Sequence, residues 1–283
     1  MTLAEIQRAL PDAIIILADH FRFAAAEQRS SSCVSSRRLF WCRSGKGSVT
    51  VNNERFALSA GKFLCMPWDH AVVYEADRRS PFVVGSIHII PNYPRRTQVI
   101  YNVSHEKGER DYPQRSDVAL PGLTSTMSGD LALAPSLGML SEYIVSAFRR
   151  DRGEMLMRAL APVIIHEVMA SLSAQKSVPP SLAAAVSYLE KKGRVTLSEL
   201  SRIAHCSSST VIRMFREHYG TTPGHFIIER KIARAKDLLT GTGMPIESVA
   251  EAVGITDPFY FSRIFKKIVG VSPRQCRTES RFL

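Results

Sequence analysis

The hydrophobic pattern of the 283-residue chain changes character along its length. Between residues 37 and 90, short apolar runs alternate with polar positions and are separated by turn signals, a pattern typical of β-strands. Asn52-Asn53 separates two of these runs and predicts a hairpin turn. Strands at this spacing indicate a small β-barrel or sandwich. The predicted strands cover residues 13–18, 38–42, 48–51, 55–58, 62–66, 71–75 and 81–90.

A helical period follows between Ser136 and about Ala174, where apolar residues recur on one face of each of two segments divided at Arg152-Gly153. We expect two amphipathic helices that pack on the β-region or on a partner chain. The segment before them, residues 91–135, contains five prolines and predicts no long element. Two prolines at the end of residues 176–180 forbid a continuous helix and predict a linker. The pattern therefore divides the chain into residues 1–135, 136–175, 176–180 and 181–283.

The C-terminal region contains an internal repeat with a spacing of about 50 residues. Each copy predicts a short helix, a tight turn and a second helix. In the first copy, Thr196 to Glu199 is a capping box, His205-Cys206 make the turn and Ser207 is an N-cap. In the second copy, Gly254 supplies the turn, and Asp257 caps a helix whose first residue is Pro258. The matched pairs are Arg213 with Arg263, Phe215 with Phe265, Gly220 with Gly270 and Pro223 with Pro273.

A helix held by a short preceding helix has the width to enter the DNA major groove, which is about 12 Å wide. The predicted helix from Pro223 to Thr240 between the copies could space the two units by about one DNA turn, near 34 Å. The alternative is a pair of purely structural helical hairpins. Two matched copies in one segment favour DNA binding over that alternative.

The charge of the chain supports the same interpretation. The net charge is +11, and residues 176–283 hold 17 Lys and Arg against 9 Asp and Glu, whereas residues 1–175 hold 20 against 17. Such an asymmetry indicates a nucleic acid or an anionic membrane as partner. No window reaches 18 consecutive apolar residues, so no membrane span is expected. None of the five cysteines forms a C-x-x-C pair, which argues against a disulfide framework or structural zinc and fits a reducing cytoplasm.

At residues 181–277 the sequence resembles the AraC/XylS family of bacterial transcription regulators. The resemblance lies in the first copy from Arg213 to Pro223, in residues 230–239, and in the second copy from Val249 to Pro273. It implies a seven-helix DNA-binding domain that reads two successive major-groove segments. Two departures are visible: Ser201 stands where alanine is usual, and Pro245 where a capping serine is usual.

By position in that resemblance, residues of the second helix in each copy would face DNA. Arg213 and Arg263 are the expected base readers, because arginine can bind guanine through two hydrogen bonds. The other residues expected to face the bases are Ser208, Ser209, Ile212, Phe259, Tyr260 and Ser262. The expected phosphate partners are Ser207, Arg216, Lys266 and Lys267.

The N-terminal region is similar to the cupin-like sensor domains of the same family. Gly45-x-Gly47, the run from Gly61 to Pro67, and His70 carry this looser resemblance. It implies a barrel that binds a small effector, followed by helices used for dimerisation. The candidate effector-binding residues are Trp41, His70, Glu75 and His88.

No catalytic site, metal site or cofactor is expected. His70 and His88 are isolated, whereas a metal needs three or four converging ligands. Cys33, Cys42 and Cys65 lack the partners of a reactive thiolate. The alternative from another class is a cupin enzyme with a DNA-targeting tail, which stoichiometric bound metal would favour.

We therefore expect an α+β chain, with a cupin-like β-barrel and flanking helices followed by an all-α domain with two helix-turn-helix units. The expected function is sequence-specific transcription regulation, with activation as the commoner outcome in the family, under control of a small effector such as a sugar or another metabolite. The expected partners are double-stranded promoter DNA, RNA polymerase and a second copy of the chain. The expected location is the bacterial cytoplasm, on the nucleoid when DNA is bound.

Overall fold

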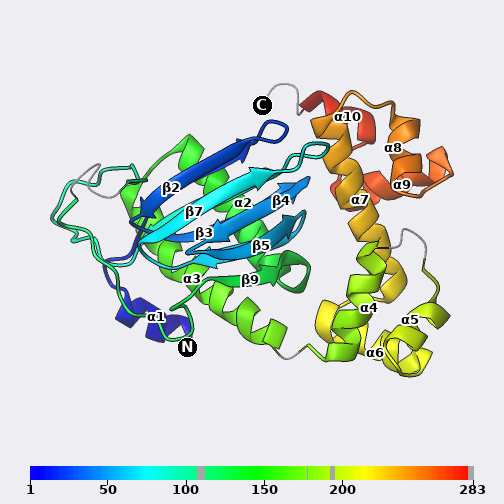
Figure 1. The fold of residues 1–283 in the computed structure, drawn as a ribbon, viewed down its shortest axis with the longest axis horizontal. Coiled ribbons are helices and arrows are strands. Elements are labelled where there is room, and N and C mark those ends of the chain that lie inside the picture. Colours follow the sequence, from blue (N-terminus) through cyan, green and yellow to red (C-terminus); the bar gives the residue numbers. More distant parts are fainter. Residues whose placement is uncertain (107–111, 177, 192–194, 280–283) are drawn as a thin grey trace. The chain divides into compact units, whose positions relative to one another are not determined.

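The computed structural model describes residues 1–106, 112–176, 178–191 and 195–279 (Figure 1). The chain separates into two compact units, Met1–Lys176 and Ser177–Leu283. Each unit has buried apolar residues of its own, so each unit is stabilised by a separate hydrophobic core.

The described part of the first unit contains two antiparallel sheets. The five-stranded sheet has the order β1 (Ile14–Arg22), β8 (Val83–Ile90), β3 (Arg37–Ser44), β6 (Lys62–Met66) and β9 (Met127–Asp130). The four-stranded sheet has the order β2 (Gln28–Val34), β7 (His70–Ala76), β4 (Lys46–Val51) and β5 (Glu54–Ser59).

The predicted barrel is not closed. Among the described residues, β1, β9, β2 and β5 each pair with one neighbour and leave the other edge of the sheet open. The strands bury their apolar faces by packing one sheet on the other, which needs no continuous ring of hydrogen bonds. Between the sheets, the rings of Phe40 and Tyr74 lie 5.3 Å apart, and those of Phe23 and Phe82 lie 4.6 Å apart. The first unit is therefore a two-sheet structure with an aromatic interior.

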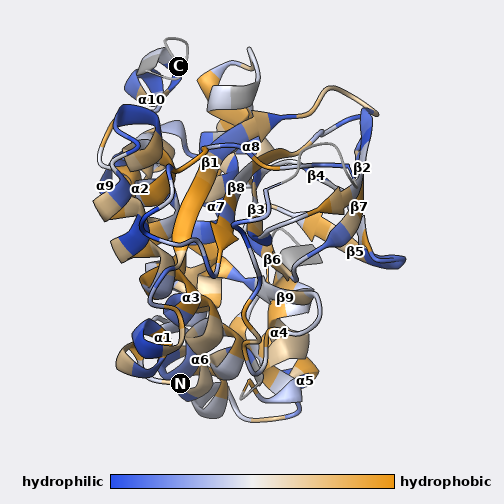
Figure 2. Cartoon of the chain, turned by 90° about the vertical axis from the view of Figure 1, so that its left-hand side faces the viewer, coloured by the Kyte–Doolittle hydropathy of each residue, from blue (hydrophilic) through white to orange (hydrophobic). Residues whose placement is uncertain are grey.

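Burial along the strands shows which sheet is covered on both faces. In β7 every second residue from His70 to Ala76 is buried, as in a sheet with one covered face. In β8 seven consecutive residues, Val84 to Ile90, are buried. The second cover is formed by α2 (Pro135–Arg150) and α3 (Glu154–Lys176), which pack on β1. The hydrophobic residues of β1 are visible in Figure 2.

Glu142 fixes α2 to the sheet. Its carboxylate accepts hydrogen bonds from Trp41 Nε1 at 3.0 Å and Arg43 Nε at 2.9 Å, and lies 3.2 Å from His20 Nε2. Trp41 can lie flat on β8 because its neighbour there is Gly85, where an added Cβ would lie 2.1 Å from the indole ring. Gly85, Trp41 and Glu142 together therefore hold α2 on the five-stranded sheet.

The remaining elements of the first unit are short. Helix α1 (Leu3–Ala9) begins at a capping box formed by Thr2 and Glu5 and packs on α3. A 3-10 turn, η1 (Leu131–Leu133), precedes α2. The window Glu154–Gln175 of α3 is long and apolar enough to cross a membrane, but half of it is buried within the structure. That burial matches the core helix of a globular unit.

The second unit is all-helical in its described residues. Its helices are α4 (Pro180–Lys191), α5 (Leu197–Ile203), α6 (Ser208–Tyr219), α7 (Pro223–Gly241), α8 (Ile246–Ala252), α9 (Pro258–Val269) and α10 (Pro273–Glu279). Helix α7 connects the two ends of this unit, with α4 to α6 at its start and α8 to α10 at its end (Figure 1). The rings of Phe215, Tyr219 and Phe226 meet at the start of α7, and Phe261 and Phe265 pack against its end.

Candidate nucleic-acid interface and effector site

The first helix pair, α5 and α6, is built by local capping and one tight turn. Thr196 and Glu199 form the predicted capping box at the start of α5. His205 adopts a left-handed conformation with φ of 51° and reverses the chain. The Ser207 hydroxyl then accepts the Thr210 N–H at 3.2 Å and caps α6. Gly220, with φ of 65°, ends the helix.

The second pair, α8 and α9, repeats this design with different residues. Pro245 precedes α8 and provides no side-chain cap. Gly254 makes the turn with φ of 70°, and its carbonyl accepts a hydrogen bond from Lys231 Nζ of α7 at 2.9 Å. The Asp257 carboxylate accepts the N–H groups of Phe259 and Tyr260 at 2.9 and 3.1 Å. The turn and the start of α9 are therefore held by both backbone and side-chain contacts.

Burial of one face leaves the opposite face of each second helix in solvent. Val211 and Phe215 in α6, and Phe261 and Phe265 in α9, are buried. Most of the residues predicted to meet DNA are exposed. They are Ser207, Ser208, Ser209, Arg213 and Arg216 around α6, and Phe259, Tyr260, Ser262, Arg263, Lys266 and Lys267 in α9. Each helix thus presents a polar or aromatic ridge of the kind that can enter a major groove.

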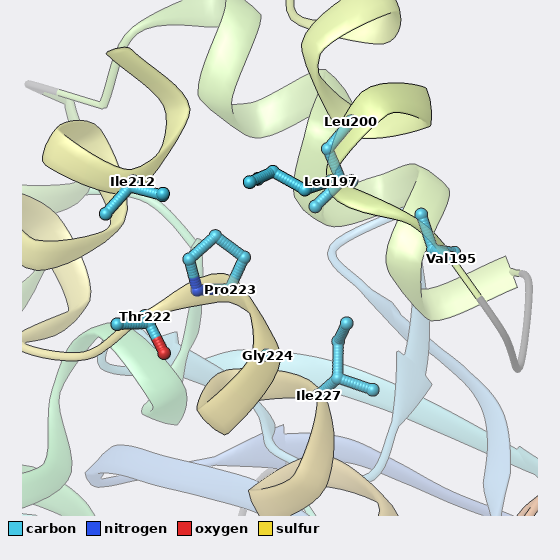
Figure 3. Close-up of a pocket in the computed structure, with 8 residues that line it drawn as sticks. All are labelled: Val195, Leu197, Leu200, Ile212, Thr222, Pro223, Gly224 and Ile227. Atoms are coloured by element: carbon cyan, nitrogen blue, oxygen red, sulfur yellow. The ribbon is translucent and has the colours of Figure 1, made fainter. Parts of the chain in front are cut away.

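Ile212 is placed differently from the other predicted residues. It is half-buried and lines an apolar pocket of about 300 Å³ between α5, α6 and the start of α7 (Figure 3). The other lining residues are Val195, Leu197, Leu200, Thr222, Pro223, Gly224 and Ile227. A base contact for Ile212 stays a prediction.

The hydroxyl groups around α6 are already hydrogen-bonded to one another. Ser201 and Ser208 lie 2.9 Å apart and connect α5 to α6, while Ser207 lies 2.8 Å from the hydroxyls of both Ser209 and Thr210. Ser201, the first departure noted in the sequence, therefore ties the two helices together. The Arg213 guanidinium donates to Glu217 at 3.3 Å one turn further along.

In the first unit, His70 and His88 come together in the space between the sheets. His70 donates through Nδ1 to the Pro67 carbonyl at 2.7 Å, and its buried Nε2 has no partner among the described residues. His88 Nδ1 is hydrogen-bonded to the Ser36 hydroxyl at 2.8 Å. Burial lowers the pKa of His70 to about 3, and the nearby charge of Arg38 acts in the same direction. Burial also holds the pKa of His88 well below its ordinary value, so both rings are neutral at neutral pH.

Arg38 also belongs to the polar cluster around His70 and His88, although the sequence analysis does not predict it there. It stands opposite His88 in the register of β3 and β8, donates to the Ser86 hydroxyl at 2.8 Å, and reaches across to the Tyr74 hydroxyl on the other sheet. Its guanidinium lies 4.7 Å from the centre of the Phe40 ring. Arg38 forms no ion pair among the described residues, so this half-buried cation is surrounded by neutral groups.

Trp41 and Glu75, the other two effector candidates, do not join the cluster. Side chains along a strand alternate between faces, and Trp41 is three residues from Arg38, which puts it on the helix-covered face beside Glu142. Glu75 follows Tyr74 directly and points outward, where it pairs with Arg55 at 2.7 Å and accepts from Ser48 at 2.6 Å. Glu75 therefore faces away from the space between the sheets, where His88 is buried.

Within the residues that the structure describes, no group of three or more His, Cys, Asp or Glu is arranged to hold a metal ion. The polar cluster between the sheets instead offers hydrogen-bond donors and acceptors around a cation. Such groups can form hydrogen bonds to a polar molecule.

Comparisons with known proteins agree with the geometry of the second unit. Residues 200–279 match the family model described as a helix-turn-helix domain. An uncharacterized HTH-type transcriptional regulator, YisR of Bacillus subtilis, is 23% identical over 278 residues, which cover 94% of each chain. The MmsAB operon regulatory protein of Pseudomonas aeruginosa is 24% identical, over 93% of this chain and 81% of the relative. The arabinose operon regulatory protein of Escherichia coli is 41% identical over 71 residues, 25% of this chain and 24% of the relative.

The exposed helix ridges and the matched domain define a DNA-binding transcription regulator of the helix-turn-helix class, and the relatives that it resembles are transcriptional regulators. The MmsAB and arabinose relatives are both regulatory proteins of operons. These matches support a regulator of the AraC/XylS family.

Proposed function

We propose that both helix pairs act as helix-turn-helix units and read successive major-groove segments on one side of a promoter. The observation that carries this proposal is the duplicated ridge. Residues at the same positions of α6 and α9, offset by 50 in the sequence, are exposed in both helices, and each helix follows a short helix and a tight turn.

The length of α7 supports this arrangement. The helix has 19 residues, which at about 1.5 Å per residue gives a rod of roughly 28 Å. Two recognition helices on successive major-groove segments lie about 34 Å apart. A rigid connector of comparable length favours contacts one helical turn apart.

Selection from a randomised duplex library at physiological ionic strength, with the full chain, tests this function. We expect enrichment of one preferred sequence, and footprinting on it should show protection of two segments separated by about one DNA turn. Recovery of a random pool would contradict sequence-specific binding. A duplex of the same length and scrambled sequence controls for attraction between the basic second unit and phosphate.

We further propose that the first unit is a sensor whose cupin-like interior binds a small effector around Arg38, His70 and His88. The support is chemical: Arg38 is bordered by neutral donors and acceptors, and His70 Nε2 is buried without a partner among the described residues. A sugar or another polar metabolite would satisfy such groups by hydrogen bonds.

Thermal-shift screening of the full chain against sugars and other polar metabolites tests the sensor role. A ligand at 100 times its Kd stabilises the folded unit by about 3 kcal/mol and raises its melting temperature. Arg38→Met should abolish that shift while leaving DNA binding intact. A ligand that shifts the wild type and the Arg38→Met protein equally would contradict this location.

Effector binding would act on transcription through the assembly of the protein on DNA. We propose a homodimer formed through the helices of the first unit, because α2 exposes Met139 and Tyr143 on one face, one turn apart. We propose activation, through contact with RNA polymerase in the bacterial cytoplasm. Sedimentation should give a dimer that Met139→Glu dissociates, and a monomeric wild type at micromolar concentration would contradict the dimer.

A further inference from the structure

The two recognition helices expose different chemistry at equivalent positions. An offset of 50 residues superimposes Ser209 on Phe259, Arg213 on Arg263, Arg216 on Lys266 and Glu217 on Lys267. All eight of these side chains are exposed. The two helices therefore expose equivalent positions, but the side chains at those positions differ in charge and polarity.

In α6, the arginine at the base-reading position is engaged within the protein. The Arg213 guanidinium donates to Glu217 at 3.3 Å, and both side chains are more than half exposed. Binding a guanine would require Arg213 to leave this carboxylate, and Glu217 itself repels the phosphates beside the groove. Ser209, at the position of Phe259, is hydrogen-bonded to Ser207.

In α9, the equivalent arginine has no such restraint. Arg263 forms no ion pair in the described part of the chain, and its guanidinium lies 5.8 Å from the Tyr260 ring. The residue one turn further along is Lys267, which attracts the phosphates that Glu217 repels. Helix α9 carries three cations and no acidic residue, and the only nearby carboxylate in sequence, Asp257, is occupied as the N-cap.

Phe259 adds an exposed apolar surface at the N-terminus of α9. Its side chain is 88% exposed, the largest exposed fraction among the large apolar residues that the structure describes. Covering such a ring with an apolar group of a partner is favourable. On the exposed ridge of α9, Phe259 lies one turn before Arg263, a separation of about 6 Å along the axis or roughly two base steps.

We infer that α9 is the dominant sequence reader, with Phe259 selecting a thymine by its methyl group and Arg263 selecting a guanine within about two base pairs of it. Helix α6 contributes mainly affinity and little selectivity. This inference rests on the proposed reading of DNA by both helix pairs. The preferred site is consequently asymmetric, with one strongly and one weakly specified segment.

Selection from a randomised duplex library with the full chain and four variants tests the inference. The wild type should enrich a thymine and a guanine in one segment and leave the other nearly random. Phe259→Ala should reduce discrimination against the other bases at the thymine position by roughly 5- to 100-fold, with the guanine preference retained. Met155→Ala is the matched control, because Met155 is an apolar residue of α3 that is 87% exposed and lies outside both recognition helices, and it should leave the selected sequence unchanged.

Exchanging the charges at the equivalent positions 217 and 267 provides the second part of the experiment. Glu217→Lys should release Arg213 and create a guanine preference in the weak segment, whereas Lys267→Glu should diminish the guanine preference in the strong one. Circular dichroism verifies that each variant is folded. Two equally specified segments in the wild type, or a thymine preference that survives Phe259→Ala, would overturn the inference. Loss of every sequence preference in the wild type would instead defeat the proposed function itself.

Discussion

Lowering the pH from 7 to 5 should destabilise the first unit, because two histidines are buried there in the neutral form. His70 is fully buried and its pKa is lowered to about 3, mainly by burial. His88 is 1% exposed and its pKa is also well below its ordinary value. In the unfolded chain both rings have an ordinary pKa of 6.5 and bind a proton below it. Below pH 6.5 the two histidines therefore bind protons in the unfolded state but stay neutral in the folded state.

The magnitude follows from linkage between protonation and folding. Each unit of pH below the unfolded pKa is worth about 1.4 kcal/mol for a histidine that stays neutral in the folded state. Between pH 6.5 and 5 each buried histidine lowers the free energy of unfolding by about 2 kcal/mol, and the pair by about 4 kcal/mol. Glu142 does not enter this window. Although burial raises its pKa, the bond from His20 and the charge of Arg43 lower it to about 2, so its contribution is lost only below about pH 4.5.

Urea unfolding followed by tryptophan fluorescence measures this effect in the first unit alone, because both tryptophans, Trp41 and Trp68, lie there. His70→Asn keeps a donor near the Pro67 carbonyl and removes one titrating ring, so it should remove about half of the change between pH 7 and 5. An unfolding free energy that is the same at both pH values in the wild type would refute the neutral, buried state. An unchanged slope in His70→Asn would refute the role of that residue.

Three further outcomes are expected. Arg263→Ala should cost about 1–3 kcal/mol of binding free energy on the selected duplex and relax selectivity at one base pair, while Lys267→Ala should weaken all duplexes alike; equal losses of Arg263→Ala on selected and random DNA would contradict base reading. Gly85→Ala should lower the stability of the first unit by about 1–3 kcal/mol, because the new Cβ overlaps the Trp41 ring, whereas Gly138→Ala, with its nearest neighbour 4.0 Å away, should not; equal melting temperatures would count against that packing. The logarithm of the DNA association constant should fall linearly with the logarithm of salt concentration, as phosphate contacts require, and a flat dependence would exclude them.

The sequence predicts those parts of the fold whose stabilisation is local. The caps at Thr196, Ser207 and Asp257 and the turn at Gly254 depend on neighbours within a few residues, and the structure has them where the sequence places them. Strands with an alternating apolar pattern, such as β7, are equally evident. The sequence does not predict strand β2, because its residues are mostly polar and exposed and it is held by pairing with β7.

The candidate effector site was less predictable, because it depends on how distant strands face one another. Residue type singled out four candidates, yet strand alternation sends Trp41 to the outer face of one sheet and Glu75 to that of the other. The residue type does not single out Arg38, because a strand arginine is ordinarily solvated. Only the pairing of β3 with β8 and the packing of β7 across from them put it beside His88 and Tyr74.

Methylation interference on the selected duplex tests most directly whether both helix pairs enter the major groove, because methylation of guanine N7 blocks that groove. Binding by the full chain should be lost at guanines in two segments about 10 base pairs apart on the same side of the helix. Interference confined to a single segment, or spread evenly around the duplex, would contradict two successive major-groove contacts.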